Sequence, residues 1–462
     1  MLGQLILVAV LGSSALAQTV PVFGQCGGES YTGATQCAAG NNCVVFNPFF
    51  FQCVPDTETF TGSPTITNTG TVGASPTSTV KTTSTVASTT PVKSTSTVAS
   101  TTTVSTPFPT GFVKTSGTRF TLNGAPFTVF GTNAYWPALQ GYSNADIDQA
   151  FADMAAAGVT VVRGFNEVTN PFQGQVFFHQ WAGATATVNT GTAGLQRLDQ
   201  VVASAKAHGI RVIITLSDFG GMDVYAAQLI GSGQPHDVFY TNPTIIAAFK
   251  TYVQAVVSRY ANEPGVMVGN EPRCAGSNTA ASANCTTATI TNWASTISTF
   301  IKSLDANHLV ALGDEGFLNE PGTHNFDFVY QGTLGIDFAA NMNIKTLDFG
   351  TFHESWGETA NPDSVTWGVQ WINDHAAIMK TANKPAIMEE FGLASSSGAT
   401  RAAQYTTWYN AIISSGLTGD LVWQAGSDLS TGPTPNDGFA IFPSDPVYAL
   451  MKQHAAALKS RG

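Results

Sequence analysis

The feature of this sequence that most restricts its fold is a regular alternation of strand-like and helix-like segments from about residue 129 onward. The strand-like segments are short apolar runs without polar alternation, which is typical of parallel strands buried on both faces. We expect strands at residues 129–135, 159–165, 211–216, 265–270, 309–314, 347–353, 386–391 and 421–424. A helical pattern follows each strand, at residues 145–157, 195–208, 245–260, 288–304, 336–342, 365–381, 401–414 and 447–459.

Eight such units predict an α/β fold in which residues 111–462 form a (β/α)₈ barrel, or TIM barrel. An open, doubly wound sheet is the alternative, but no phosphate-binding GxGxxG motif follows the first strand. A hairpin should precede the barrel, because residues 119–122 and 126–130 flank Asn123-Gly124, a favoured tight-turn pair.

The segment before the barrel, residues 56–110, has a different composition. It is dominated by Thr, Ser, Val and Pro and contains a direct repeat, at residues 84–90 and 96–102. Such a segment has no apolar face to bury, so we expect an extended linker. Its dense hydroxyl groups also predict O-glycosylation, and Asn284-Cys285-Thr286 is a formal N-glycosylation sequon.

Six cysteines divide into a cluster of four and a distant pair. Residues 18–55 contain Cys26, Cys37, Cys43 and Cys53, and a module this short needs disulfides because it cannot bury a sufficient core. Zinc is the alternative for four cysteines, but there is no CxxC pair and no nearby histidine. We therefore expect a small disulfide-rich antiparallel β module, and a further disulfide between Cys274 and Cys285.

The first 17 residues have the pattern of a signal peptide. An apolar stretch, residues 5–11, is followed by Ala15-Leu16-Ala17, a small-residue cleavage site. The stretch is too short to span a bilayer, so we expect no membrane partner. The signal-peptide pattern predicts a secreted, extracellular protein, and we expect it to be a monomer. The net charge of −11 and the lack of any basic run argue against nucleic acid as a partner.

Functional side chains of a barrel lie at the carboxyl ends of its strands. The expected strand ends carry Arg163, Asn270, Glu271, Arg273, His353, Glu389, Glu390 and Trp423. Two glutamates on separate strands suit hydrolysis of a glycosidic bond, which needs one carboxylic acid and one carboxylate. An isolated glutamate is more often a surface charge, and a lone histidine or tryptophan is as often structural. Because side chains alternate along a strand, only one of Glu389 and Glu390 should face the barrel mouth.

Other chemistries find less support in the sequence. It contains no HExxH motif, and the candidate ligands have no recognisable metal-ligand spacing. A GxSxG nucleophile elbow is also missing. We therefore expect no metal and no cofactor.

Residues 22–54 closely resemble the fungal-type cellulose-binding module of family 1. The matching motifs are Gly24-Gln25-Cys26-Gly27-Gly28, Tyr31-Thr32-Gly33 and Asn47-Pro48-Phe49-Phe50-Phe51-Gln52-Cys53. The resemblance implies that Cys26 pairs with Cys43 and Cys37 with Cys53. It also implies a flat aromatic strip and three polar contacts to cellulose, formed by Phe23, Phe49 and Phe50, and by Gln25, Asn47 and Gln52.

From about residue 109 onward the chain resembles the endo-β-1,4-mannanases of glycoside hydrolase family 5. The matching motifs are Gly131-Thr132-Asn133-Ala134-Tyr135-Trp136, Ser217-Asp218-Phe219-Gly220-Gly221-Met222-Asp223, Asn270-Glu271-Pro272-Arg273-Cys274, Leu312-Gly313-Asp314-Glu315-Gly316-Phe317 and Glu389-Glu390-Phe391-Gly392. The resemblance implies random, retaining hydrolysis of β-1,4-bonds in mannans, galactomannans and glucomannans. It assigns Glu271 as acid/base and Glu390 as nucleophile. The substrate-binding residues that it implies are Trp136, Arg163, Asn270, Arg273, His353 and Trp423.

The chain departs from this family pattern at four strand ends. After Arg163, before Ser217, before Asn270 and after His353 it is a few residues short, and each site lacks a Trp or Tyr. Remodelling of the site and misread gene boundaries both explain such losses, and both stay open. Two other functions also stay open: an endo-β-1,4-glucanase of the same family, and a non-catalytic wall-binding protein with a degenerate active site.

Overall fold

The computed structural model describes residues 19–20, 25–27, 34–47, 50–55, 108–164, 176–217, 219–263, 271–276, 279–321, 328–354 and 364–462. The chain divides into two compact units, Met1–Thr101 and Thr102–Gly462. The expected signal peptide and nearly all of the expected linker lie outside the described residues.

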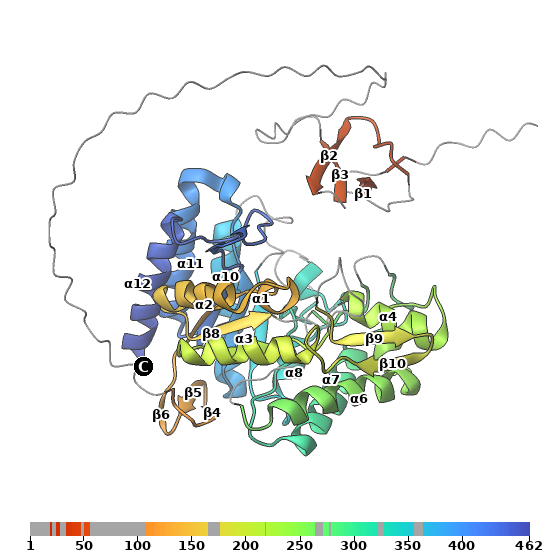
Figure 1. Ribbon diagram of the computed structural model, residues 1–462, viewed down its shortest axis with the longest axis horizontal. Helices are drawn as coiled ribbons and strands as arrows, with labels where there is room; N and C mark the ends of the chain where they lie inside the picture. The colour runs from red at the N-terminus through yellow and green to blue at the C-terminus, as the bar shows by residue number, and fades with distance from the viewer. Residues whose placement is uncertain are drawn as a thin grey trace, which may run out of the picture. The chain divides into compact units, whose positions relative to one another are not determined.

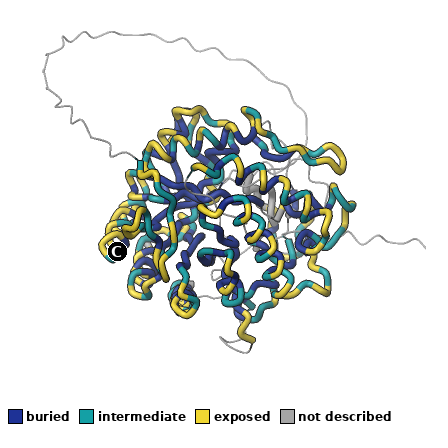
Figure 2. The backbone as a smooth tube through the Cα atoms, turned by 90° about the horizontal axis from the view of Figure 1, so that it is seen from below, coloured by how far each residue is buried: buried dark blue, intermediate teal, exposed yellow. Residues whose placement is uncertain are grey.

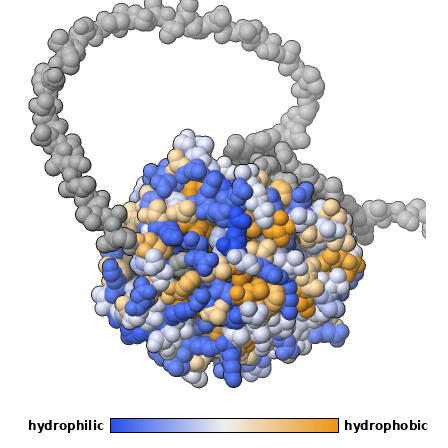
Figure 3. Space-filling model, turned by 60° about the horizontal axis from the view of Figure 1, so that its bottom comes forward, coloured by the Kyte–Doolittle hydropathy of each residue, from blue (hydrophilic) through white to orange (hydrophobic). Residues whose placement is uncertain are grey.

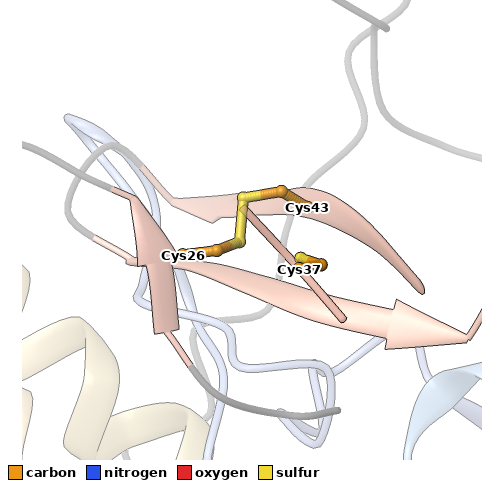
Figure 4. A group of neighbouring side chains, drawn as sticks. All are labelled: Cys26, Cys37 and Cys43. Atoms are coloured by element: carbon orange, nitrogen blue, oxygen red, sulfur yellow. A yellow bond between two sulfur atoms is a disulfide. The ribbon is translucent and has the colours of Figure 1, made fainter. Parts of the chain in front are cut away.

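The smaller unit contains an antiparallel sheet with the strand order β1-β3-β2. Its strands are β1 (Gln25–Gly27), β2 (Asn41–Asn47) and β3 (Phe50–Pro55). Disulfides join Cys26 to Cys43 and Cys37 to Cys53, which are the pairs that the resemblance implies. Figure 4 shows the first of these bonds between β1 and β2. Only Val20, Cys26 and Cys53 form the buried core of the described part, so the disulfides supply the stability that a larger core would give.

The residues expected to contact cellulose are only partly covered by the structure. Phe23 and Phe49 lie outside the described residues. The backbones of the other four lie in the strands of this sheet, namely Gln25, Asn47, Phe50 and Gln52. Their contacts with cellulose stay a prediction.

The larger unit is built around a six-stranded parallel sheet with the order β11-β8-β7-β14-β13-β12. The strands are β7 (Val129–Asn133), β8 (Val161–Gly164), β11 (Arg211–Ile214), β12 (Gly350–His353), β13 (Ala386–Phe391) and β14 (Gly419–Val422). The first of them, β7, pairs with both β8 and the last strand, β14. A sheet whose first and last strands are neighbours closes on itself, as a barrel does.

Two expected strands of the barrel are not seen as strands. Residues 265–270 lie outside the described residues. The expectation of a strand at 309–314 is wrong in detail, because this segment forms no regular ladder. It still runs beside β12, since the N–H groups of Asp348 and His353 donate to the carbonyls of Val310 and Glu315, at 2.7 and 3.1 Å. Gly313 has a φ of 74°, which breaks the extended backbone at the end of this segment.

All eight expected helices are confirmed. They are α2 (Asn144–Ala156), α3 (Leu195–Ala207), α6 (Pro243–Tyr260), α7 (Thr287–Leu304), α8 (Phe338–Met342), α10 (Ser364–Ala382), α11 (Arg401–Ser415) and α12 (Pro446–Arg461). Figure 1 shows the helices of this unit arranged around its strands. In Figure 2 the strands are buried, whereas the helices expose their outer faces, as expected of amphipathic helices that cover a barrel.

Local sequence explains where several of these helices begin. The Ser143 hydroxyl accepts a hydrogen bond from the Asp146 N–H, and the Asn242 side chain caps α6 in the same way. Proline occupies the first turn of both α6 and α12, where its missing N–H costs nothing.

Several shorter elements were not expected from the sequence. They are α1 (Trp136–Leu139), α4 (Phe219–Ile230), α5 (Val238–Thr241), the hairpins β9 (His179–Ala182) with β10 (Thr185–Val188) and β15 (Asp428–Leu429) with β16 (Gly432–Pro433), and the 3₁₀ helices Phe328–Tyr330 and Ser395–Thr400.

The expected hairpin closes the amino-terminal end of the barrel. The hairpin is β5 (Arg119–Leu122) with β6 (Ala125–Pro126), which is shorter than the expected 126–130, and an unexpected strand, β4 (Val113–Ser116), pairs with the other edge of β5. Asn123 and Gly124 have φ angles of 53° and 82°, as a tight turn of this kind requires. Phe120 of the hairpin is buried in one cluster with Val129 and Leu421, which lie in barrel strands. Because this end is filled by apolar side chains, polar chemistry is confined to the opposite, carboxyl end of the strands.

None of the described helices is both long and apolar enough to cross a bilayer. On the face that Figure 3 presents, hydrophilic and hydrophobic residues are interspersed.

Candidate active site

The carboxyl ends of the strands bring two glutamates and a histidine together. His353, the last residue of β12, places Nδ1 3.0 Å from Glu271 Oε1 and Nε2 3.8 Å from Glu390 Oε1. One polar side-chain atom each of Glu271, His353 and Glu390 can be chosen so that all three lie within 4.8 Å of one another. Three residues far apart in the sequence therefore form one cluster, and Glu271 and Glu390 face each other across it.

Arg163, at the end of β8, holds the carboxylates of β13. Its Nε lies 3.1 Å from Glu389 Oε1, and its Nη1 donates to Glu390 Oε1. Nη1 also donates to Asn133 Oδ1 at 2.9 Å, and the Asn133 amide in turn donates to the Glu389 carbonyl. The guanidinium is only 3% exposed, so its single positive charge is shared between the buried Glu389 carboxylate and the partly exposed Glu390 carboxylate, and its contacts fix their direction.

The structure corrects the expectation that Glu389 and Glu390 face opposite sides. Both carboxylates reach Arg163, because the pairing of β13 is irregular at its end. Register shifts fall between Phe352 and His353 on one side and between Met388 and Phe391 on the other. Such an irregularity re-aims side chains that would otherwise alternate. Exposure still separates the two, since the Glu389 side chain is 1% exposed and that of Glu390 is 13% exposed.

Arg273 links Glu271 to a further buried carboxylate. Its Nη2 lies 3.4 Å from Glu271 Oε2, and its Nε lies 2.9 Å from Glu315 Oε1. Glu271 itself has a φ of 47°, in the left-handed region, and its N–H donates to the Gly313 carbonyl at 2.8 Å. A non-glycine residue in this region costs about 1–3 kcal/mol, and such residues cluster at functional sites.

The charges of the cluster determine where its protons are. Burial alone would lower the pKa of His353, but the charge of Glu390 and the hydrogen bonds with Glu271 and Glu389 raise it to about 10. Burial would raise the pKa of Glu271, but the hydrogen bond and charge of His353, with Arg273, lower it. At neutral pH the free site therefore holds an imidazolium between carboxylates, and Glu271 must gain a proton before it can act as an acid.

Two aromatic residues, Tyr135 and Trp423, follow the carboxyl ends of β7 and β14. The backbone N–H of Trp423 donates to the Phe391 carbonyl at 2.7 Å, which places Trp423 next to the end of β13. Its indole stacks on Tyr135 with a centroid separation of 6.4 Å and an interplanar angle of 17°. Both side chains are partly exposed, so they offer apolar ring faces at the carboxyl ends of the strands.

The expectation that Trp136 contacts substrate is wrong in this structure. Trp136 is fully buried, at 0% exposure, and meets Tyr142 edge-on. The reason is local: β7 ends at Asn133 and α1 begins at Trp136, which turns the indole into the core. Tyr135 is the partly exposed aromatic residue of this motif.

The loop that follows Glu271 is closed by a disulfide between Cys274 and Cys285. Two aspartates outside the loop hold it as well. Thr279 donates its hydroxyl to Asp223 at 2.7 Å, and the Ser282 N–H donates to Asp237 at 2.6 Å. Because Arg273 directly precedes Cys274, the same attachments position the Arg273 guanidinium beside Glu271.

Replacing both Cys274 and Cys285 by serine is expected to lower the stability of the barrel. Closing a loop of this length contributes about 3 kcal/mol by restricting the unfolded chain, or about 4 °C in Tm for a domain of this size. Thermal unfolding of the wild-type and double-serine proteins measures the difference. An unchanged Tm, or free thiols at these positions in the wild-type protein, would contradict the prediction.

Two groups among the described residues are close enough together to be candidate metal ligands, and one of them is Glu271, His353 and Glu390. In that group the two nitrogens of His353 contact different carboxylates, Nδ1 that of Glu271 and Nε2 that of Glu390. Cys26, Cys37 and Cys43 are close to one another, but all three are oxidised in disulfides.

Some expected site residues lie outside the described residues. They include Asn270 and Asp218. Residues that follow Arg163 and His353 at the shortened strand ends, 165–175 and 355–363, are also outside them. Conversely, the structure brings into the site three residues to which the sequence motifs alone assign no role there, Asn133, Tyr135 and Glu315, and it places Glu389 beside Arg163. Each lies within a motif or directly before a strand end, which is the signal that could have found them.

A parallel barrel with two facing glutamates at the carboxyl ends of its strands is the arrangement of a glycoside hydrolase. Comparison of the sequence with protein families agrees. Residues 120–428 match the model described as cellulase (glycosyl hydrolase family 5), and residues 22–50 match the fungal cellulose binding domain. The chain belongs to glycosyl hydrolase family 5 and carries an amino-terminal fungal cellulose-binding domain.

Relatives extend over nearly the whole chain. Mannan endo-1,4-beta-mannosidase F of Aspergillus fumigatus is 40% identical over 94% of this chain and 95% of its own length. The namesake of Aspergillus clavatus is 37% identical over 96% of this chain and 95% of its own length. The solved endo-1,4-beta-mannanase of Rhizomucor miehei is 38% identical over 76% of this chain and all of its own, with a TM-score of 0.68. These likenesses agree with the expected (β/α)₈ barrel.

Proposed function

We propose that this protein is a secreted endo-β-1,4-mannanase that hydrolyses mannans, galactomannans and glucomannans with retention of configuration and is anchored on cellulose. The observation that carries the proposal is the pair Glu271 and Glu390, whose carboxylate oxygens approach within 4.8 Å. Retaining glycosidases have carboxyl groups about 5–5.5 Å apart, whereas inverting enzymes need about 6.5–9.5 Å for an interposed water. The names of the family relatives support mannan as the substrate.

In the proposed reaction the two glutamates act in two steps. Glu390 attacks the anomeric carbon while Glu271 protonates the departing glycosidic oxygen, which leaves a glycosyl ester on Glu390. Glu271 then removes a proton from water, and the water releases the sugar from the ester. The greater exposure of Glu390 supports its assignment over Glu389, since a nucleophile must be reached by the sugar.

The remaining residues orient these groups and the substrate. Arg163 and Asn133 direct the β13 carboxylates, and His353 hydrogen-bonds Glu271. We assign Arg273 to the leaving-group side, Trp423 with Tyr135 to stacking on a sugar ring, and Asn270 to the sugar 2-hydroxyl.

Rates of reducing-end release on galactomannan and on carboxymethylcellulose test this function. We expect the rate on galactomannan to be at least about tenfold higher than the rate on carboxymethylcellulose. A preference for carboxymethylcellulose would select an endoglucanase. Failure on both, with cellulose binding intact, would select a non-catalytic wall-binding protein.

The domain organisation that we propose is a signal peptide at 1–17, a cellulose-binding module at 18–55, a linker at 56–110 and the hydrolase at 111–462. Secretion is supported by the apolar amino-terminal segment and by disulfides in both units, which persist in oxidising compartments.

Proteolytic nicking between residues 56 and 110 is expected to separate binding from catalysis. The two compact units have separate cores, so the released barrel should keep its rate on soluble mannan and lose binding to crystalline cellulose. Activity assays and cellulose pull-down on the nicked protein measure both. A loss of soluble activity on nicking would mean that the units cooperate, contrary to this organisation.

A further inference from the structure

A carboxylate outside the catalytic cluster holds the indole of Trp423. The indole N–H donates to Asp437 Oδ2 at 2.6 Å, and the other oxygen, Oδ1, accepts from the Phe439 N–H at 3.0 Å. Asp437 thus ties the exposed edge of the Trp423 ring to the backbone of the loop 436–440. The charged acceptor makes this hydrogen bond stronger than one between neutral groups.

The loop that carries Asp437 is itself fixed. Asn436 Oδ1 accepts from the N–H groups of Gly438 and Ala440, at 2.8 and 3.3 Å. The buried guanidinium of Arg401 donates to the Phe439 carbonyl at 2.9 Å and to the Leu393 carbonyl at 2.8 Å. Although Asp437 is exposed, its carboxylate is therefore presented from a rigid support.

Among the described residues, Tyr135 is the aromatic ring that stacks on the Trp423 indole, with ring centroids 6.4 Å apart. The backbone of Trp423 is held at the Phe391 carbonyl, but its side chain is partly exposed. A partly exposed tryptophan can occupy several rotamers, and ordering it during binding would weaken affinity.

We propose that Asp437 is a positioning residue that holds the Trp423 indole in the orientation in which its face meets a sugar beside Glu390. The proposal rests on the proposed function of Trp423 as a sugar platform. Asp437 acts only through the indole N–H and does not touch the reacting atoms.

A double-mutant cycle tests this assignment. Asp437→Ala is expected to raise KM about tenfold and to change kcat much less, as the loss of one charge-assisted hydrogen bond would. Asp437→Asn keeps an acceptor oxygen and should stay near the wild-type KM. Phenylalanine has no N–H, so in a Trp423→Phe background Asp437→Ala should cause no further change.

Two controls separate positioning from a general effect on folding or charge. Asp428→Ala removes the same charge from an exposed residue of β15 and leaves the Trp423–Asp437 hydrogen bond in place, so KM should not change. Near-ultraviolet circular dichroism should report a changed Tyr135–Trp423 pair in Asp437→Ala but not in Asp437→Asn, with the Tm of both unchanged.

An additive effect of Asp437→Ala in the Trp423→Phe background would overturn the proposal, and so would an unchanged KM in Asp437→Ala alone. The cycle is measured on whichever of galactomannan and carboxymethylcellulose the wild-type enzyme hydrolyses faster. A preference for carboxymethylcellulose would defeat the proposed substrate and still leave the role of Asp437 testable.

Discussion

Replacing Glu390 by alanine is expected to reduce kcat on soluble mannan by a factor on the order of 10⁵, as removal of a covalent nucleophile does in other enzymes. The truncated side chain leaves a space beside Arg163, whose guanidinium would retain its charge. Azide should enter this space and attack the anomeric carbon directly, with Glu271 protonating the leaving group. The rescued product should therefore be the α-mannosyl azide, of inverted configuration.

Glu389→Gln is the matched control for this prediction. Glu389 contacts the same Arg163 and His353, so its change should lower the rate, but by a much smaller factor. Azide should not rescue it, because azide replaces only the group that reacts at the anomeric carbon. If Glu389→Gln were inactive and rescued by azide while Glu390→Ala kept most of the rate, the assignment of the nucleophile would be wrong.

Replacing Glu271 by alanine should give a loss that depends on the leaving group. On mannan, whose leaving group needs a proton, we expect a loss of about 10³-fold or more. On 2,4-dinitrophenyl β-mannobioside, whose leaving group departs without a proton, the ester on Glu390 should still form rapidly. A burst of dinitrophenol followed by slow turnover is the expected result in stopped-flow measurements.

The configuration of the azide product distinguishes Glu271→Ala from Glu390→Ala. In Glu271→Ala, azide should attack the ester on Glu390 and give the β-mannosyl azide, of retained configuration. An equal loss on both substrates, or an α-azide product, would contradict the role of Glu271 as acid/base.

The barrel could be predicted from the sequence because the alternation of apolar strands and amphipathic helices is repeated along the chain. Strands such as 386–391 are wholly apolar until their last residues, and helices such as 245–260 have caps and periodicity that need no tertiary information. The site was predicted only in part, since strand ends are recognisable but side-chain directions are not. Arg163, Glu271, His353 and Glu390 come together, and each lies at the end of, or directly after, a strand that the sequence predicts.

The predictions of side-chain direction fail where local backbone geometry overrides the regular alternation of side chains along a strand. The pairing irregularity of β13 brings Glu389 into the site beside Glu390, and no residue pattern announces it. The exact end of β7 decides which ring of the Tyr135-Trp136 pair is buried, and the sequence does not define that end. Likewise, the hydrogen bond from Trp423 to Asp437 joins residues of a strand end and a later loop, and only the folded chain places them together.

The stereochemistry of mannopentaose hydrolysis tests the central claim most directly. The claim is that Glu271 and Glu390 form a retaining pair that acts on β-1,4-mannan. Proton NMR of the reaction in D₂O follows the anomers of the newly formed reducing ends before they equilibrate by mutarotation. We predict that the β-anomer appears first, with retention. Initial formation of the α-anomer, or no hydrolysis of mannopentaose, would contradict the account.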